Sequence, residues 1–142
     1  MREFNKIIKK PAHLNKKTIL EPHKIEISKK KYLLDAGSMD IAEKFRNEKI
    51  DGIFLTHFHP DHVQGLFHLR WGKGNTIPVY CPPDSSGCAD LYKNPGILEF
   101  NSRKKFEAFF IDDLKITPLP LIHSKVTFGY LFEFDNYCVA YL

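Results

Sequence analysis

The sequence predicts one mixed α/β domain, built as two layers or as a sandwich of sheets flanked by helices. Short β-like segments alternate with helical patterns early in the chain and pair as hairpins late in the chain. The chain has 142 residues, which is the length of a single domain and is enough to bury a substantial core.

The early part of the chain is rich in short strands. Residues 1–17 carry little pattern, and β-like segments follow at Thr18–Glu21, Lys24–Ser28 and Tyr32–Asp35. The last of these closes on Asp-Ala-Gly, which is typical of a strand followed by a turn. Ser38 can then cap a helix whose apolar positions are Ile41, Ala42 and Phe45.

The middle of the chain alternates between strand and helix. Gly52–Thr56 predicts a short apolar strand. A short helix is predicted from the spacing of Val63, Leu66, Phe67 and Leu69. Ile77–Cys81 predicts the next strand, and the turn at 82–84 can start a helix that runs through Leu91.

The last third of the chain predicts antiparallel hairpins. Phe106–Ile111 and Leu114–Leu119 form two strands joined at residues 112–113. Thr127–Phe134 alternates strictly, and a turn at Asn136 leads to a final strand over Tyr137–Leu142. The alternation places four aromatic side chains on one face: Phe128, Tyr130, Phe132 and Phe134.

Composition and charge are those of a soluble globular protein. The chain is 43% hydrophobic and 27% charged, with neither a membrane-span pattern nor a secretory signal. Its cysteines, Cys81, Cys88 and Cys138, form no C-x-x-C pair, so we expect free thiols and a cytoplasmic protein.

The positive charge is concentrated at the N-terminus. Residues 1–31 hold ten Lys/Arg and three Glu, whereas the whole chain has a net charge of +4. Such a segment can bind a polyanion, but it lacks interleaved aromatic side chains for base stacking. We therefore expect a solvated edge and not a nucleic-acid partner. His13 and His23 are predicted to be surface side chains.

A cluster of metal-ligand types follows the Gly52–Thr56 strand: His57, His59, Asp61 and His62. In an extended segment His57 and His59 point the same way and can hold one ion. Beyond the proline, Asp61 and His62 can reach a second ion. Imidazole and carboxylate ligands suit Zn, Mn or Fe, and two ions about 3.5–4 Å apart can share a hydroxide that attacks a phosphate. The alternative is a histidine-rich surface loop, which the position directly after a strand disfavours.

The motif H-x-H-x-D-H after a strand, with Asp35-Ala36-Gly37 upstream, resembles the metallo-β-lactamase superfamily. Over Tyr32–Leu142 the chain is similar to one branch, the PhnP phosphodiesterases that accompany carbon–phosphorus lyase in phosphonate breakdown. The segments that carry this likeness include His62-Val63-Gln64-Gly65-Leu66-Phe67, Leu69-Arg70-Trp71-Gly72, Thr117-Pro118-Leu119-Pro120-Leu121, His123-Ser124-Lys125 and Thr127-Phe128-Gly129-Tyr130-Leu131.

The resemblance implies an αββα sandwich, of which residues 1–142 would form the N-terminal part only. This single incomplete domain would consist of a basic segment, 1–31, and a metal-binding core, 32–142. It also implies a metal-dependent phosphodiester hydrolase that opens a small cyclic phosphate, such as phosphoribosyl 1,2-cyclic phosphate, with a metal-bound hydroxide.

The resemblance further implies roles for individual residues. The ions would be two Mn or Zn, the first held by His57, His59 and His123, the second by Asp61 and His62. Asp61 would also be catalytic, by orienting the water or taking its proton, and Asp35 would fix a ligand by hydrogen bonding. Ser124 and Lys125 would either touch the substrate phosphate or be ordinary loop residues. For three further residues we expect a surface His68, a packed Trp71 and a solvent-facing Arg70.

The chain departs from the family pattern at both ends. A later aspartate and histidine ligand would fall beyond Leu142, and a glycine-rich first strand and a cysteine cluster would precede Met1. Two hypotheses follow: part of a working enzyme, completed by a homodimer mate or another chain, or an inactive fragment that binds at most one metal or acts as an interaction module. An RNA-processing nuclease of the same superfamily is a weaker alternative, supported by the basic segment.

Overall fold

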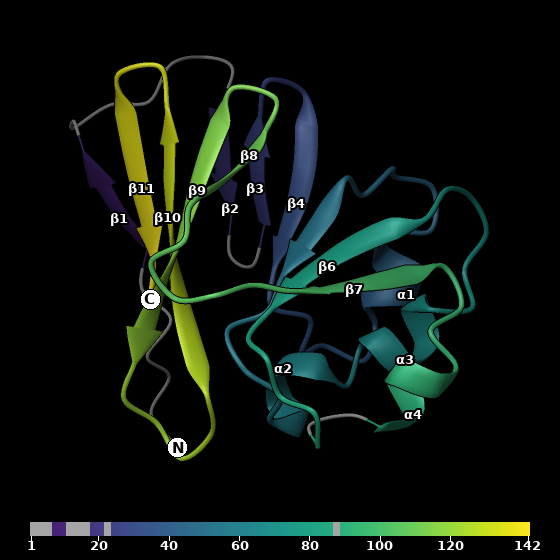
Figure 1. Ribbon diagram of the computed structural model, residues 1–142. Helices are drawn as coiled ribbons and strands as arrows, with labels where there is room; N and C mark the ends of the chain where they lie inside the picture. The colour runs from purple at the N-terminus through teal and green to yellow at the C-terminus, as the bar shows by residue number, and fades with distance from the viewer. Residues whose placement is uncertain (1–6, 11–17, 22–23, 87–88) are drawn as a thin grey trace.

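Two β-sheets pack face to face, with helices on one side of the pair (Figure 1). The structure is a computed structural model that describes residues 7–10, 18–21, 24–86 and 89–142, with side chains from residue 24 on. His13, His23, Cys88 and most of the basic segment lie outside the described residues.

The first sheet is antiparallel, with strand order β1-β11-β10-β9-β8. Its strands are β1 (Ile7–Lys10), β8 (Phe109–Ile111), β9 (Leu114–Leu121), β10 (Thr127–Phe134) and β11 (Tyr137–Tyr141). The late hairpins predicted from the sequence form this sheet. Strand β1 closes its edge by pairing Ile7 with Tyr141.

The second sheet is mixed, with strand order β2-β3-β4-β5-β6-β7. Its strands are β2 (Thr18–Glu21), β3 (Lys24–Ile27), β4 (Lys30–Leu34), β5 (Gly52–Phe54), β6 (Ile77–Cys81) and β7 (Leu98–Ser102). The first three strands pair antiparallel, and β4 to β7 pair in parallel. The carboxyl ends of the parallel strands therefore meet at one edge of the sheet, where α/β proteins bind ligands.

Four short helices cover the face of the second sheet that points away from the first sheet (Figure 1). They are α1 (Ile41–Lys44), α2 (Pro60–Val63), α3 (Leu66–Leu69) and α4 (Ala89–Lys93). Their apolar side chains join those of β5 and β6 in one buried cluster. Across the described part of the chain, no helix has the length and apolar character to cross a membrane.

A second apolar cluster fills the space between the sheets, with Phe54 at its centre. The Phe54 side chain is fully buried, and its ring contacts the rings of Tyr80, Tyr130 and Phe132 at centroid distances of 5.0–5.3 Å. The predicted face of β10 is confirmed, because its four alternating aromatic side chains are all buried in this cluster. The fold is thus a mixed α/β sandwich, as the sequence predicts.

Several local predictions are wrong. Strands β1 and β7 were not predicted, and β8 begins at Phe109 because Phe106 has a positive φ of 64° that an extended strand cannot continue. Asp40, and not Ser38, occupies the position before helix α1, without a side-chain cap.

Arg70 and Trp71 exchange their expected roles. Trp71 is 61% exposed, whereas the Arg70 guanidinium is largely covered and donates to Asp90 Oδ2 at 2.8 Å and to the Asn94 carbonyl at 3.2 Å. These acceptors come from α4 and the residue that follows it, so tertiary contact holds the arginine in place. His68 is exposed, as predicted.

Candidate metal centre

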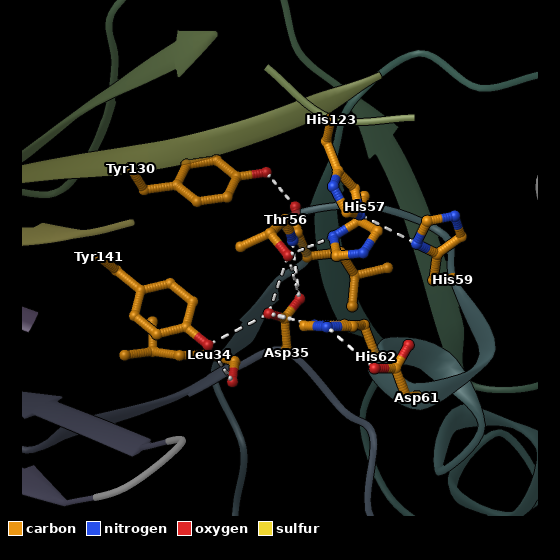
Figure 2. A network of polar contacts seen from close by, with 11 residues as sticks. Leu34, Asp35, Thr56, His57, His59, Asp61, His62, His123, Tyr130 and Tyr141 are labelled. Atoms are coloured by element: carbon orange, nitrogen blue, oxygen red, sulfur yellow. Dashed lines mark hydrogen bonds and ion pairs between the residues drawn. The ribbon is translucent and has the colours of Figure 1, made fainter. Parts of the chain in front are cut away.

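The candidate centre lies at the carboxyl ends of the parallel strands β4 and β5. Asp35 directly follows β4, and Thr56 and His57 come just after β5. The loop between β9 and β10 adds His123 from the first sheet (Figure 2). A side chain from each sheet therefore reaches the same place.

Helix α2 turns the histidine segment back on itself. Pro60 occupies the first position of α2, where its missing N–H costs no hydrogen bond. The His62 N–H donates to the His59 carbonyl at 2.9 Å, which closes the turn. His57 and His59 thus precede the turn, whereas Asp61 and His62 lie within it.

Two glycines allow the loop after β4 to lie flush against this segment. The Ala36 N–H donates to the His62 carbonyl, and the Gly65 N–H donates to the Ala36 carbonyl, both at 2.8 Å. A Cβ on Gly37 would lie 1.8 Å from the Asp61 carbonyl oxygen, and a Cβ on Gly65 would lie 2.2 Å from the Ser38 carbonyl oxygen. Only glycine fits at these two positions.

His57 is at the centre of the cluster. Its ring centroid lies 4.6 Å from that of His59, 4.1 Å from that of His62 and 4.6 Å from that of His123. Ligand atoms of His57, His59 and His123 lie within 4.8 Å of one another, and so do those of His57, Asp61 and His62. The structure therefore brings together all five residues for which the sequence suggests metal ligation.

Asp35 is the hub of a buried hydrogen-bond network beneath the cluster (Figure 2). Its Oδ1 accepts from the Thr56 N–H at 2.7 Å, and its Oδ2 accepts from Thr56 Oγ1 at 2.9 Å. The same Oδ2 lies 2.9 Å from His62 Nδ1 and 3.1 Å from the Tyr141 hydroxyl. Asp35 itself has a positive φ of 60°, a conformation uncommon outside glycine but tolerated by aspartate.

This network determines which nitrogen of His57 and His62 is available to a metal. An ionised carboxylate only accepts, so His62 Nδ1 donates to Asp35 and its Nε2 keeps the lone pair. The single hydroxyl proton of Thr56 likewise points to Asp35, so Thr56 Oγ1 accepts from His57 Nδ1 at 2.9 Å. Both rings thereby present Nε2, and His62 Nε2 lies 3.5 Å from Asp61 Oδ2.

His57 Nε2 is buried and has no hydrogen-bond partner among the described residues. A buried polar atom without a partner is costly unless a ligand satisfies it. Neutral imidazoles and a carboxylate around such an atom fit a divalent transition-metal ion. The donor set is therefore suited to divalent metal binding.

Burial and neighbouring histidines keep His57 and His59 neutral. Burial lowers the pKa of His57 to about 4, with a further contribution from the neighbouring His62. The pKa of His59 is also lowered, by desolvation first and then by His123. Since only neutral imidazole can ligate, both rings are ready to bind a metal near pH 7.

The rim of the centre carries the remaining predicted residues. His123 Nε2 lies 3.1 Å from His59 Nδ1, and the exposed Ser124 Oγ lies 3.3 Å from His59 Nε2. The Lys125 ammonium forms an ion pair with Asp84 Oδ2 at 3.3 Å. Ser124 and Lys125 are thus beside the histidines.

Three residues of the site were not predicted from the sequence: Thr56, Tyr141 and Asp84. Thr56 could have been found, because it directly precedes His57 and its hydroxyl can accept a hydrogen bond from a ligating histidine. Tyr141 and Asp84 carry no local signal. They reach the site only through the pairing of strands distant in sequence.

Sequence comparisons relate the chain to known proteins. Residues 31–142 match a family model described as the Beta-lactamase superfamily domain. Ribonuclease Z of Picosynechococcus sp. is 27% identical over 101 residues, which cover 63% of this chain and 32% of that protein. The chain spans about a third of the length of this curated relative.

Two solved structures have a similar fold. The metallo-beta-lactamase fold protein YhfI from Bacillus subtilis superposes with a TM-score of 0.64 at 19% identity, covering 78% of this chain and 49% of that one. A structure described as a new diphosphatase from the PhnP family gives a TM-score of 0.63 at 25% identity, covering 79% of this chain and 51% of that one.

Proposed function

Because this chain belongs to the metallo-β-lactamase superfamily, we propose that it carries the metal-binding region of a metal-dependent phosphodiester hydrolase. The observation that carries the proposal is the pair of donor groups that share His57, whose buried Nε2 has no hydrogen-bond partner among the described residues. The match covers about a third of the length of a curated relative. The activity of the whole protein is therefore part of the same proposal.

In this proposal His57, His59 and His123 hold one divalent ion, and Asp61 and His62 hold a second, either Zn or Mn. The bound ions would supply Lewis-acid chemistry, which activates water near neutral pH and neutralises phosphate charge. Two donor groups that overlap at His57, each with ligand atoms within 4.8 Å of one another, support two neighbouring ions.

The side chains of the chain have separate tasks in the proposed reaction. The Asp61 carboxylate is more than half exposed beside His62, so it can orient a water molecule or take its proton. Asp35 and Thr56 hold the His62 and His57 rings in orientation. The Lys125 ammonium can bind a phosphate oxygen if it exchanges its pairing with Asp84.

For the substrate we propose a small phosphodiester, in the first place a cyclic phosphate such as phosphoribosyl 1,2-cyclic phosphate. The likeness to a protein described as a diphosphatase from the PhnP family supports a small phosphate compound as substrate. The position of the His123-Ser124-Lys125 loop also supports it, because the loop sets one cation and one hydroxyl beside the histidines.

RNA is the second candidate substrate. The observation that favours it is that curated relatives of this chain are named Ribonuclease Z or Ribonuclease BN, with identities of 27% and 30% for two of them. The basic segment 1–31 would then contact the RNA backbone.

Hydrolysis assays with the full chain test both candidates. The metal-loaded protein is given bis(p-nitrophenyl) phosphate, phosphoribosyl 1,2-cyclic phosphate, a 2′,3′-cyclic nucleotide and a structured RNA. We expect turnover of the small diesters, with losses of at least about 100-fold in His59→Ala and Asp61→Ala. His68→Ala, an exposed histidine outside the cluster, serves as the control and should keep full activity.

Three outcomes would change the proposal. Activity on RNA alone would favour the nuclease. Unchanged activity in both site variants would contradict the metal mechanism. Elemental analysis separates the remaining case: about two ions per chain without turnover would indicate that a second copy or another chain must complete the enzyme, whereas no bound metal would indicate an inactive fragment.

A further inference from the structure

Tyr141 connects the first sheet to the candidate metal centre. It is 2% exposed, and its hydroxyl lies 3.1 Å from Asp35 Oδ2 and 3.5 Å from the Leu34 carbonyl oxygen. The tyrosine belongs to β11, whereas Asp35 follows β4 of the second sheet. The hydrogen bond therefore crosses the interface between the sheets, beneath the histidine cluster (Figure 2).

The oxygen that accepts from Tyr141 also faces His62. Asp35 Oδ2 lies 2.9 Å from His62 Nδ1, so the tyrosine hydroxyl and the imidazole meet at one atom. A donor on the far side of Oδ2 restricts rotation of the carboxylate. A carboxylate fixed in this way determines the direction in which His62 presents Nε2.

We infer that Tyr141 is a positioning residue for metal binding, which acts through Asp35 on His62. This inference rests on the proposed function. Removing its hydroxyl leaves Asp35 bonded to Thr56 and His62 but freer to rotate. Hydrogen-bond partners behind a metal ligand commonly contribute about 10–100-fold to metal affinity. A residue of β11 in the first sheet would thereby help to orient a ligand in helix α2.

Tyr130 provides a matched control. It is also fully buried between the sheets, and its hydroxyl donates to the Leu55 carbonyl at 2.6 Å and lies 3.2 Å from the Tyr80 carbonyl. Both of these acceptors are backbone atoms and not side chains of the centre. Tyr130→Phe and Tyr141→Phe therefore make the same chemical change, but only the second touches Asp35.

The test is metal affinity, measured with the full chain. Wild type, Tyr141→Phe and Tyr130→Phe are titrated with Co²⁺ and Zn²⁺ against a chromophoric chelator, and the ligand-field spectrum of bound Co²⁺ is recorded. We expect Tyr141→Phe to bind the more weakly held ion about 10–100-fold less tightly, with a changed Co²⁺ spectrum. Tyr130→Phe should keep both the affinity and the spectrum of the wild type.

Asp35→Asn tests the same contacts without altering the tyrosine. If Tyr141 acts through Asp35, adding Tyr141→Phe to Asp35→Asn should cause little further loss of affinity, because the two effects are not additive. The inference would be overturned if the two losses were additive, or if either Tyr141→Phe or Asp35→Asn kept the wild-type affinity. An equal loss of affinity in Tyr130→Phe would also overturn it.

The metal readout also separates this inference from the proposed function. Wild-type protein that binds metal but hydrolyses no phosphodiester shows that this chain alone is not the proposed enzyme, and it leaves the role of Tyr141 untouched. Unchanged metal affinity in Tyr141→Phe contradicts the role of Tyr141 alone. Wild-type protein that binds neither Co²⁺ nor Zn²⁺ would overturn both.

Discussion

At the scale of single residues, the candidate centre depends on Thr56 as much as on the histidines. One hydroxyl links the carboxylate of Asp35 to the ring of His57 and thereby selects the tautomer of His57. This one oxygen both donates a hydrogen bond to Asp35 and accepts one from His57. The hydroxyl is buried, so water cannot replace it when it is removed.

Thr56→Val should separate this hydroxyl from the shape of the side chain. The variant keeps the volume but leaves His57 Nδ1 without its acceptor, so metal affinity should fall about 10–100-fold. Unfolding of the metal-free protein should become easier by about 1–3 kcal/mol, because a buried donor loses its partner. Thr56→Ser keeps the hydroxyl and should behave much like wild type in chelator competition and urea denaturation; equal effects of Val and Ser would contradict the prediction.

The pKa of His57 predicts a pH dependence of stability in the metal-free protein. The folded chain takes up this proton only near pH 4, whereas an unfolded chain takes it up near pH 6.5. Between these values the unfolded state binds more protons, so stability falls as the pH decreases from 6.5 to 4 and is unaffected by His57 above 6.5. The loss from this group should reach at most about 3 kcal/mol.

Urea denaturation at several pH values in the presence of a chelator measures this effect. His57→Gln should flatten the decline between pH 6.5 and pH 4. The exposed His68, changed to Gln, should leave the curve as in wild type. A wild-type curve that is flat across this window would contradict the assigned shift.

At the scale of elements, the loop after β4 and the segment 61–65 form one unit. Two backbone hydrogen bonds of 2.8 Å join them through Ala36, and Gly37 lies directly over the Asp61 carbonyl. The position of the turn that carries Asp61 and His62 is therefore set by contact with a loop that precedes it by some twenty-five residues in the printed sequence.

Gly37→Ala should disturb this unit. The added Cβ would lie 1.8 Å from the Asp61 carbonyl oxygen, so the backbone must separate. We expect a destabilisation of about 1–3 kcal/mol together with weaker metal binding, measured by thermal unfolding and chelator competition. Gly72→Ala, whose Cβ would approach its nearest backbone atom only to 3.1 Å, should have a much smaller effect on both; comparable effects would contradict the steric argument.

At the scale of the whole molecule, the aromatic layer between the sheets holds the site together. Asp35, Thr56 and His57 follow strands of the second sheet. His123 lies in a loop between two strands of the first sheet, and Tyr141 lies in β11 of that sheet. Their spacing is therefore fixed by the side chains packed between the sheets, above all by Phe54. Loss of this packing would loosen the centre without touching a ligand.

Phe54→Ala tests this dependence. The side chain is fully buried among four aromatic rings, so its removal should cost about 3–5 kcal/mol of stability. Phe110→Ala, at a position that is 66% exposed in the neighbouring part of the first sheet, should change stability by less than about 0.5 kcal/mol. Urea denaturation of both variants provides the comparison, and a small loss in Phe54→Ala would contradict the central role of this ring.

The sequence by itself determined the features that depend on neighbouring residues. His57, His59, Asp61 and His62 lie within one short run after a strand, so their chemistry can be recognised from spacing alone. The alternation of β10 likewise predicts its buried face, because side chains in a strand point to opposite sides in turn. These features need only the local geometry of the backbone.

The tertiary structure alone decided the rest. It places the hydroxyl of Tyr141 on Asp35, 106 residues earlier in the chain, and pairs Arg70 with Asp90, leaving Trp71 exposed. It also adds β1 and β7 at the edges of the sheets, where a weak pattern becomes a strand only because a neighbour offers hydrogen bonds. Contacts of this kind depend on which strands pair and which faces are buried together, and the energy that selects them is distributed over the whole core and not over any one segment.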